Sequence, residues 1–173
     1  MAGSLIKIDE EIVSSSAATV TLTGIDSTYD VYQVIFNNVV PSTDSVDLFC
    51  RVTESSTPNT TANYDYAVKL MRTASSFINV SNTNNTVFDL GNNIGTNTGE
   101  ATNGIMMIYN ANNSSEYTFI TTEFAEFNSS PELTSWTGGG VFTSASSVNG
   151  LHYFFDSSSN IASGTFTLYG LKK

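Results

Sequence analysis

Hydrophobic and polar residues alternate along much of this chain, which is the pattern of β-strands with one buried face. The clearest cases are YDVYQVIF at 29–36 and VDLFCRVT at 46–53, in which apolar residues recur at every second position. The segment that joins them, NNVVPSTDS, contains Asn, Pro, Ser and Asp, which favour turns. This part of the chain predicts two strands joined by a turn, with no catalytic motif between them.

The same pattern predicts about ten short strands, separated by turn-forming clusters such as SNTNN and DSSSN. The segment at 64–73 also alternates and is interpreted as a strand, with a short helix as the competing interpretation. Many short strands with regular turns indicate an all-β protein, either a sandwich or a barrel. The expected strands are 5–8, 18–23, 29–36, 46–53, 64–73, 86–90, 104–110, 116–124, 139–143, 151–156 and 164–171.

Two of these strands are apolar on both faces, GIMMIYN at 104–110 and LHYFFD at 151–156. Such a strand either lies in the middle of a sheet that is covered on both sides or turns its second face towards another subunit. Large exposed apolar patches are rare on monomers. We therefore predict a homo-oligomer in which Met106, Ile108 and Phe154 lie in the contact between subunits.

The N-terminal segment, residues 1–12, is expected to be either an arm or an edge strand. Leu5, Ile6 and Ile8 precede the acidic run DEE, and such a segment can add a strand to the sheet of a neighbouring subunit. The remaining residues, 13–173, show no internal repeat and no linker rich enough to divide them. They are expected to form a single domain.

Uncharged polar residues dominate the composition. The chain contains 24 Ser, 23 Thr and 18 Asn, whereas charged residues make up only 13%, so solubility depends on hydroxyls and amides. With 11 Phe and 8 Tyr, this is not the composition of a disordered chain. Sixteen acidic residues against six basic ones give a net charge of −10, so we expect no binding to nucleic acid.

The sequence carries no membrane or secretion signal that we recognise. No apolar run approaches the roughly 20 residues that cross a bilayer, and the start, MAGSLIKIDEE, lacks the basic region and apolar core of a signal peptide. We therefore expect a soluble protein made in a cytoplasm. Cys50 is the only cysteine, which excludes an internal disulfide, and its inward strand position predicts a packed thiol.

The titratable residues form no recognisable catalytic set. His152 is the only histidine and lies among apolar residues of a strand, so a structural role is expected. Glu123 and Glu126 have the residue types of a glycosidase pair, but their spacing places them on opposite faces or across a turn. No serine lies in a G-x-S-x-G elbow. We predict a protein without enzymatic activity and without a cofactor.

Two pairs of aspartates near predicted turns offer oxygen ligands for calcium. They are Asp26 with Asp30 and Asp44 with Asp47, and neither pair lies in the D-x-[DN]-x-[DN]-G loop of an EF-hand. Aspartate is also a common turn former. The sequence predicts no metal site and leaves open whether a loop binds calcium.

Trp136 is followed by Thr137 and by glycines at 138–140, the most unusual local feature of the chain. One interpretation is an exposed aromatic side chain on a flexible loop, which would contact a sugar or a neighbouring protein. The other is a core tryptophan beside a glycine bend at a strand edge. Sequence alone leaves both interpretations open.

Three phrases of the chain resemble a known group of proteins. They are LTGIDSTYDVYQVIFNNVVPSTDSVDLFCRVT, then TNGIMMIYN followed by EYTFITTE, and the ending SGTFTLYGLKK. Together they resemble short structural proteins of the virions of tailed bacteriophages. The resemblance implies that residues 13–173 form an antiparallel jelly-roll-like β-sandwich of about eight to ten strands.

The same resemblance implies a role on the virion surface, after synthesis in the host cytoplasm. The expected role is that of a capsid decoration, or cement, protein that binds the outer surface of the major capsid protein shell and stabilises it as a homotrimer. The alternative is a tail-fibre or receptor-binding module, with other tail proteins or host surface glycans as partners. No single motif specifies whether the protein lies on the head or on the tail of the virion.

Overall fold

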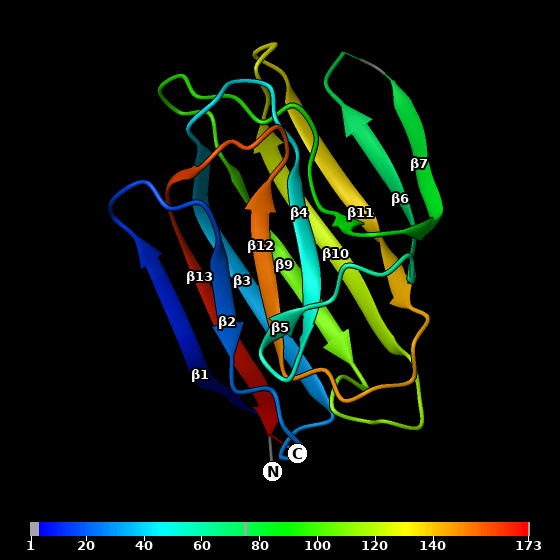
Figure 1. Ribbon diagram of the computed structural model, residues 1–173. Coiled ribbons are helices and arrows are strands. Elements are labelled where there is room, and N and C mark those ends of the chain that lie inside the picture. The colour runs from blue at the N-terminus through cyan, green and yellow to red at the C-terminus, as the bar shows by residue number, and fades with distance from the viewer. Residues whose placement is uncertain (1–3, 75, 173) are drawn as a thin grey trace.

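The computed structural model describes residues 4–74 and 76–172 and consists of two antiparallel β-sheets packed face to face (Figure 1). The predicted all-β sandwich is confirmed, and the segment at 64–73 is a strand. The strands are β1 (Ser4–Val13), β2 (Val20–Thr23), β3 (Val31–Pro41), β4 (Leu48–Glu54), β5 (Thr57–Pro58), β6 (Tyr64–Arg72), β7 (Phe77–Asn85), β8 (Phe88–Asp89), β9 (Thr102–Tyr109), β10 (Thr118–Phe127), β11 (Leu133–Phe142), β12 (Gly150–Phe155) and β13 (Ile161–Lys172).

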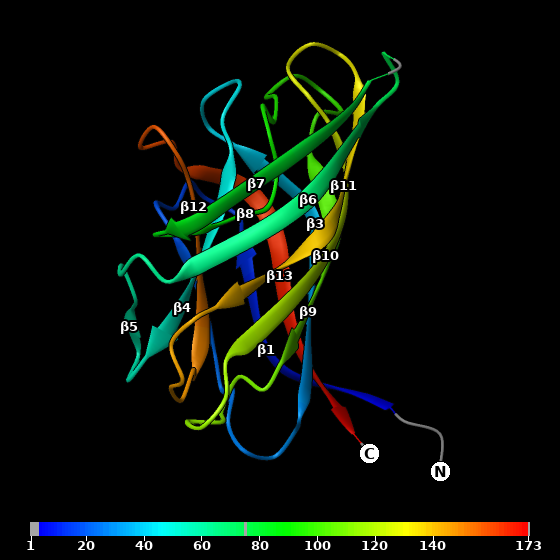
Figure 2. The ribbon, with the colours of Figure 1, turned by 90° about the vertical axis from the view of Figure 1, so that its right-hand side faces the viewer.

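The two sheets differ in size. The larger has eight strands in the order β1-β13-β3-β9-β10-β11-β6-β7. The smaller has the order β2-β12-β4-β5, with β8 pairing with another part of β4. Figure 2 shows the smaller sheet lying against one face of the larger one. The described part of the chain contains no helix long and apolar enough to cross a membrane.

Strict alternation fixes which side chains of the larger sheet face the smaller one. Along β10, every second residue from Thr118 to Glu126 is buried, and every residue between them is exposed. A half-buried strand has this period because successive side chains point to opposite faces. The larger sheet therefore has an inner face in the core and an outer face towards solvent.

Aromatic side chains join the two sheets at the centre of the core. The ring of Phe36 on β3 lies 4.9 Å from that of Phe124 on β10 and 5.2 Å from that of Tyr153 on β12. Because β12 belongs to the smaller sheet, the contact between Phe36 and Tyr153 crosses the sandwich, and each of the two contacts adds about 0.5–1.5 kcal/mol beyond the area it buries. Cys50 also lies in this core, fully buried, so the predicted packed thiol is confirmed.

The N-terminal segment pairs within its own sheet. From Ser4 onwards it forms the edge strand β1, whose register with β13 places Ser4 opposite Lys172. Leu5 and Ile6 remain 45% and 39% exposed, whereas Ile8 packs against the core after a register shift. The described residues therefore do not form an arm that leaves the domain, and residues 1–3 of the predicted segment lie outside the described part.

The glycines after Trp136 lie inside β11 and form no loop. A Cβ on Gly138 would lie 2.4 Å from the carbonyl oxygen of Ala67, and one on Gly140 would lie 2.7 Å from the Phe88 ring. Both positions therefore need glycine because another strand or ring approaches too closely for a side chain. Close packing therefore explains the glycine run, and a need for a flexible loop does not.

Candidate functional site

Trp136 lies in the core, where it is 1% exposed, so its interpretation as a surface platform for a sugar or a protein is wrong. Its Nε1–H donates a hydrogen bond to Oε1 of Glu126 at 2.9 Å. The inward register of β11 and the close packing at Gly138 and Gly140 place the indole between the sheets. The second interpretation, a core tryptophan, is confirmed.

Met106 and Ile108 also lie in the core, fully buried, so their assignment to a subunit contact is wrong. Strand β9 lies in the middle of the larger sheet, between β3 and β10, and the smaller sheet covers the face that carries these two residues. The opposite face of the same strand carries Ile105, Met107 and Tyr109, which are only partly buried. The partly open face of this strand is therefore the one that carries Ile105, Met107 and Tyr109, and not the one that carries Met106 and Ile108.

Phe154 is half-buried on the outward face of the smaller sheet. Its ring lies 5.8 Å from that of Phe49, and the guanidinium carbon of Arg51 lies 4.7 Å from its centroid. Part of its apolar surface is therefore already covered by neighbours within the chain. The described contacts give Phe154 a local packing role and do not test its predicted role between subunits.

Partly exposed apolar side chains gather on the outer face of the larger sheet. Cross-strand pairs place Val31 opposite Tyr109, Tyr109 opposite Phe119, and Phe119 opposite Val141, in one row across four strands. Leu5 and Leu171 form a further exposed pair on β1 and β13. We call the central surface the outer apolar face; its residues are Val31, Ile35, Ile105, Met107, Tyr109, Phe119 and Val141.

Glu126 is a buried carboxylate at the end of the core. Its Oε1 accepts hydrogen bonds from Trp136 Nε1 at 2.9 Å, Thr134 Oγ1 at 2.9 Å and the backbone N–H of Asn92 at 3.1 Å. Its Oε2 is buried without a hydrogen-bond partner among the described residues. Desolvation by burial outweighs these bonds and raises the pKa of Glu126 to about 7.

Other carboxylates share the surroundings of Glu126. Burial, followed by the charge of Asp47, raises the pKa of Asp89 to about 7, and burial also raises the pKa of Asp47. Carboxyl groups that titrate near neutrality are common in active sites. Glu126, however, is only 1% exposed, so a substrate has no direct access to it. The cluster is a structural feature of the core that responds to pH.

The remaining sequence candidates for chemistry are dispersed. Glu123 is exposed and Glu126 buried on β10, so the expected placement on opposite faces is confirmed. Nδ1 of His152 is hydrogen-bonded to Thr21 Oγ1 at 2.8 Å, and burial, then the charge of Arg51, lowers the pKa of this histidine. No group of three or more His, Cys, Asp or Glu side chains within residues 4–74 and 76–172 could hold a metal ion.

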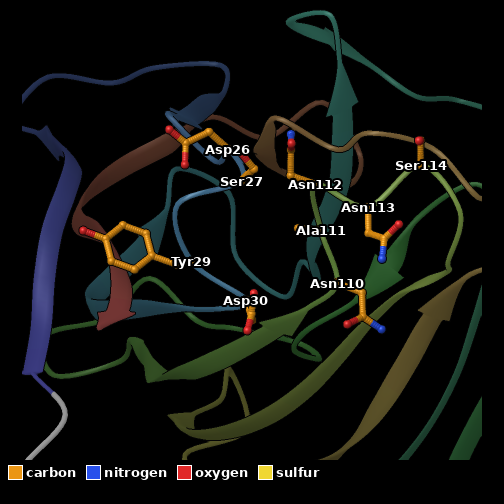
Figure 3. A pocket seen from close by; sticks show the side chains of 9 residues that line it. All are labelled: Asp26, Ser27, Tyr29, Asp30, Asn110, Ala111, Asn112, Asn113 and Ser114. Atoms are coloured by element: carbon orange, nitrogen blue, oxygen red, sulfur yellow. The ribbon is translucent and has the colours of Figure 1, made fainter. Parts of the chain in front are cut away.

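The two aspartate pairs have different outcomes. Asp26 and Asp30 line one hollow at the end of the sandwich (Figure 3). By contrast, Asp44 accepts a hydrogen bond from the backbone N–H of Thr96, while Asp47 accepts one from Asn93. Both carboxylates of this second pair hold neighbouring backbone in place.

The hollow that contains Asp26 and Asp30 has a volume of about 300 Å³ and lies between two loops. One loop leads from β2 into β3, and the other follows β9. Figure 3 shows the polar side chains of both loops around this space. Its polar and aromatic lining includes Asp26, Tyr29, Asp30, Asn110, Asn112 and Asn113.

Sequence reasoning missed the buried carboxylate and most of the hollow. Glu126 carries a signal, because it continues the inward series of Ile120 and Phe124 in the alternation of β10. The hollow carries no sequence signal, because it forms only when two loops about 80 positions apart in the chain meet. These loops contain residues 26–30 and 110–114.

Comparison with known proteins identifies no relative. No family model, curated protein or solved structure matches this chain.

Proposed function

We propose that this protein is a non-enzymatic structural component of a tailed-bacteriophage virion, namely a capsid decoration protein that binds the major capsid protein shell as a homotrimer. The resemblance of its strand phrases to short phage virion proteins supports this role. A rigid all-β domain with polar uncharged loops suits a particle surface, and its net negative charge keeps free subunits soluble before assembly.

The observation that carries the proposal is the outer apolar face. Its seven side chains lie on one face of one sheet, with the polar Gln33 and Thr121 on either side of Met107, and partly exposed apolar surface of this kind marks interaction sites on soluble proteins. Fully burying one such side chain contributes about 1.5–3 kcal/mol relative to leaving it exposed. Because these side chains are already half-buried, each contributes less than that in a contact.

A second copy of this chain is the proposed occupant of the outer apolar face. A net charge of −10 makes copies repel one another, so they approach best where carboxylates are few or offset. The seven side chains are uncharged, and the residues paired with them or beside them carry both signs. Glu123 lies opposite Ile105, Asp65 lies opposite Val141, and Lys69 lies opposite Thr137. In a trimer, the outer apolar face of each copy contacts a different surface patch of the next copy, and three such contacts around a threefold axis close into a ring.

A tail-fibre or receptor-binding module that recognises host surface glycans is the second candidate function. The hollow between residues 26–30 and 110–114 is the observation that favours it, because amides and carboxylates are the groups that recognise hydroxyls. Trp136 no longer supports this candidate, since it is buried.

We predict that Met107→Glu separates the trimer without unfolding the subunit. Met107 lies at the centre of the outer apolar face, opposite Gln33 and Thr121, and a charge there would be desolvated in the contact. Association should weaken at least about tenfold, which corresponds to 1.4 kcal/mol. Multi-angle light scattering at micromolar concentration measures the oligomer, and circular dichroism verifies the fold.

The functional test uses virus particles that lack this protein. The purified chain and Thr60→Glu, a control in an exposed loop away from the face, should co-sediment with these particles, whereas Met107→Glu should bind less. A wild-type protein that remains monomeric and does not co-sediment would refute the decoration role.

A further inference from the structure

We infer that the hollow between residues 26–30 and 110–114 binds an uncharged sugar ring. The hollow borders the outer apolar face, because Asp30 precedes Val31 and Asn110 follows Tyr109, but it shares none of the seven residues of that face, and the inference does not rest on the proposed trimer. Its volume of about 300 Å³ reaches the lower end of the range of small-ligand pockets, about 300–1,000 Å³. Figure 3 shows its polar side chains arriving from two separate loops.

The lining has hydrogen-bonding capacity that the fold does not use. The carboxylate of Asp26 accepts hydrogen bonds from Thr28 and Tyr32, and its two oxygens together can accept about four. Asn112 donates through Nδ2 to the carbonyl of Val148, which leaves its Oδ1, and Asn113 accepts through Oδ1, which leaves its Nδ2. The side chain of Asn110 makes no hydrogen bond to another described residue. Both donors and acceptors are therefore available in one small space.

This mixture of groups suits vicinal hydroxyls. Each hydroxyl donates one hydrogen bond and accepts others, so a sugar ring pairs with amides and carboxylates at the same time. Tyr29 supplies a partly apolar wall, since its ring packs over Gly170 and lies 5.8 Å from the ring of Tyr32. The C–H groups on a face of a sugar ring can pack against such a surface, as other apolar groups do.

The charges of the hollow disfavour anionic small ligands. Its lining contains two carboxylates and no lysine or arginine, which disfavours phosphates, nucleotides and acidic sugars. The backbone N–H of Thr28 donates to Asp26 at 2.7 Å and holds the pKa of this carboxyl below its usual value, so Asp26 is charged at neutral pH. No described cluster of three metal-ligating side chains exists there to bind a cation.

The walls of the hollow are held in position before a ligand arrives. The Tyr32 hydroxyl donates to the carbonyl of Asp26 at 2.6 Å and accepts from its N–H at 3.0 Å. On the other loop, the N–H of Val148 donates to the carbonyl of Ala111 at 2.7 Å. Groups fixed in this way lose little conformational entropy on binding, which favours a weak ligand such as a single sugar.

Saturation-transfer NMR on the full chain tests the inference. The probes are glucose, galactose, mannose and their N-acetylamino forms, with glucuronic acid and sialic acid as acidic sugars and putrescine as an amine. We expect transfer to at least one neutral sugar at millimolar concentration and none to the acidic sugars, while the amine tests whether the two carboxylates bind a cation in preference to a sugar.

Two variants locate the site. Asn110→Gly removes the amide and tolerates the positive φ of 59° that Asn110 adopts, while Asp26→Asn removes the charge and keeps the side-chain shape. Each should weaken binding of the neutral sugar at least tenfold with an unchanged circular dichroism spectrum. The matched control, Thr60→Glu in an exposed loop, should bind the sugar as the wild type does.

Three results would overturn the inference: transfer to no neutral sugar, transfer that survives in both pocket variants, or a preference for acidic sugars or the amine. Sugar binding is measured on the full chain whatever its oligomeric state, so a failure of the trimer leaves the sugar result unaffected. The two proposals therefore fail separately.

Discussion

Replacing Trp136 with phenylalanine is expected to destabilise the protein by about 3 kcal/mol at pH 8. The variant loses the hydrogen bond from Nε1 to the Glu126 carboxylate, and such bonds to charged groups contribute roughly 1.5–3 kcal/mol. It also leaves a void where the larger ring was buried. Chemical denaturation followed by circular dichroism measures the loss.

The same substitution should cost less at pH 5, because Glu126 is then protonated and no longer needs a donor for its charge. Glu126→Gln provides the matched background, since a neutral amide retains an acceptor at the same place. In that background, Trp136→Phe should cost about 1 kcal/mol less than in the wild type at pH 8. An equal cost at both pH values and in both backgrounds would assign the whole effect to ring packing.

The protein is expected to lose stability as the pH rises from about 4 to about 7. Glu126 and Asp89 have folded-state pKa values raised to about 7, while their unfolded values lie near 4. The folded state therefore binds more protons than the unfolded state across this window, so the stabilising contribution is complete below it and is lost as the pH rises through it. The combined change should be a few kcal/mol, because each pKa unit corresponds to about 1.4 kcal/mol.

Asp26 limits this gain on the acid side. The backbone N–H of Thr28 lowers the pKa of its carboxyl, so its contribution is present above the unfolded value and is lost below it. Stability should therefore be greatest near pH 4–5, which lies close to the unfolded-state values of these groups. Denaturant titrations at half-unit pH steps measure the curve.

Glu126→Gln should flatten the decline between pH 5 and 8, whereas Glu123→Gln should not. Glu123 lies on the same strand but on the exposed face, so it serves as the matched control. A wild-type curve that rises from pH 5 to pH 8, or a Glu123→Gln curve as flat as that of Glu126→Gln, would contradict the assignment to the buried cluster.

The sequence predicted the sandwich because most strands alternate clearly, and it failed where alternation is absent. β7 is rich in Asn and Ser and carries no strand signal, yet it forms because its backbone pairs with β6 at the sheet edge. β11 begins at Leu133, well before the predicted position, because the glycine run concealed its first half. Backbone pairing and close packing are tertiary effects that local patterns do not report.

The candidate sites were harder to predict because they depend on which face of a strand is covered. On β9, Ile105 and Met107 are as apolar as Met106 and Ile108. The alternation therefore separates the two faces of the strand but does not indicate which face is buried. The pairing register determines which face is buried, because Met106 lies opposite the buried Val34 of the neighbouring strand. The hollow between residues 26–30 and 110–114 needed the meeting of two distant loops, and no single segment of the sequence contains it.

Imaging of intact virus particles tests the central proposal most directly. Cryo-electron microscopy of the wild-type particle, compared with one lacking this chain, should show a difference density on the outer surface of the head shell. The proposal predicts three copies of the sandwich around each occupied threefold position, in contact through the outer apolar face. Density confined to the tail, or particles that are identical with and without the chain, would contradict it.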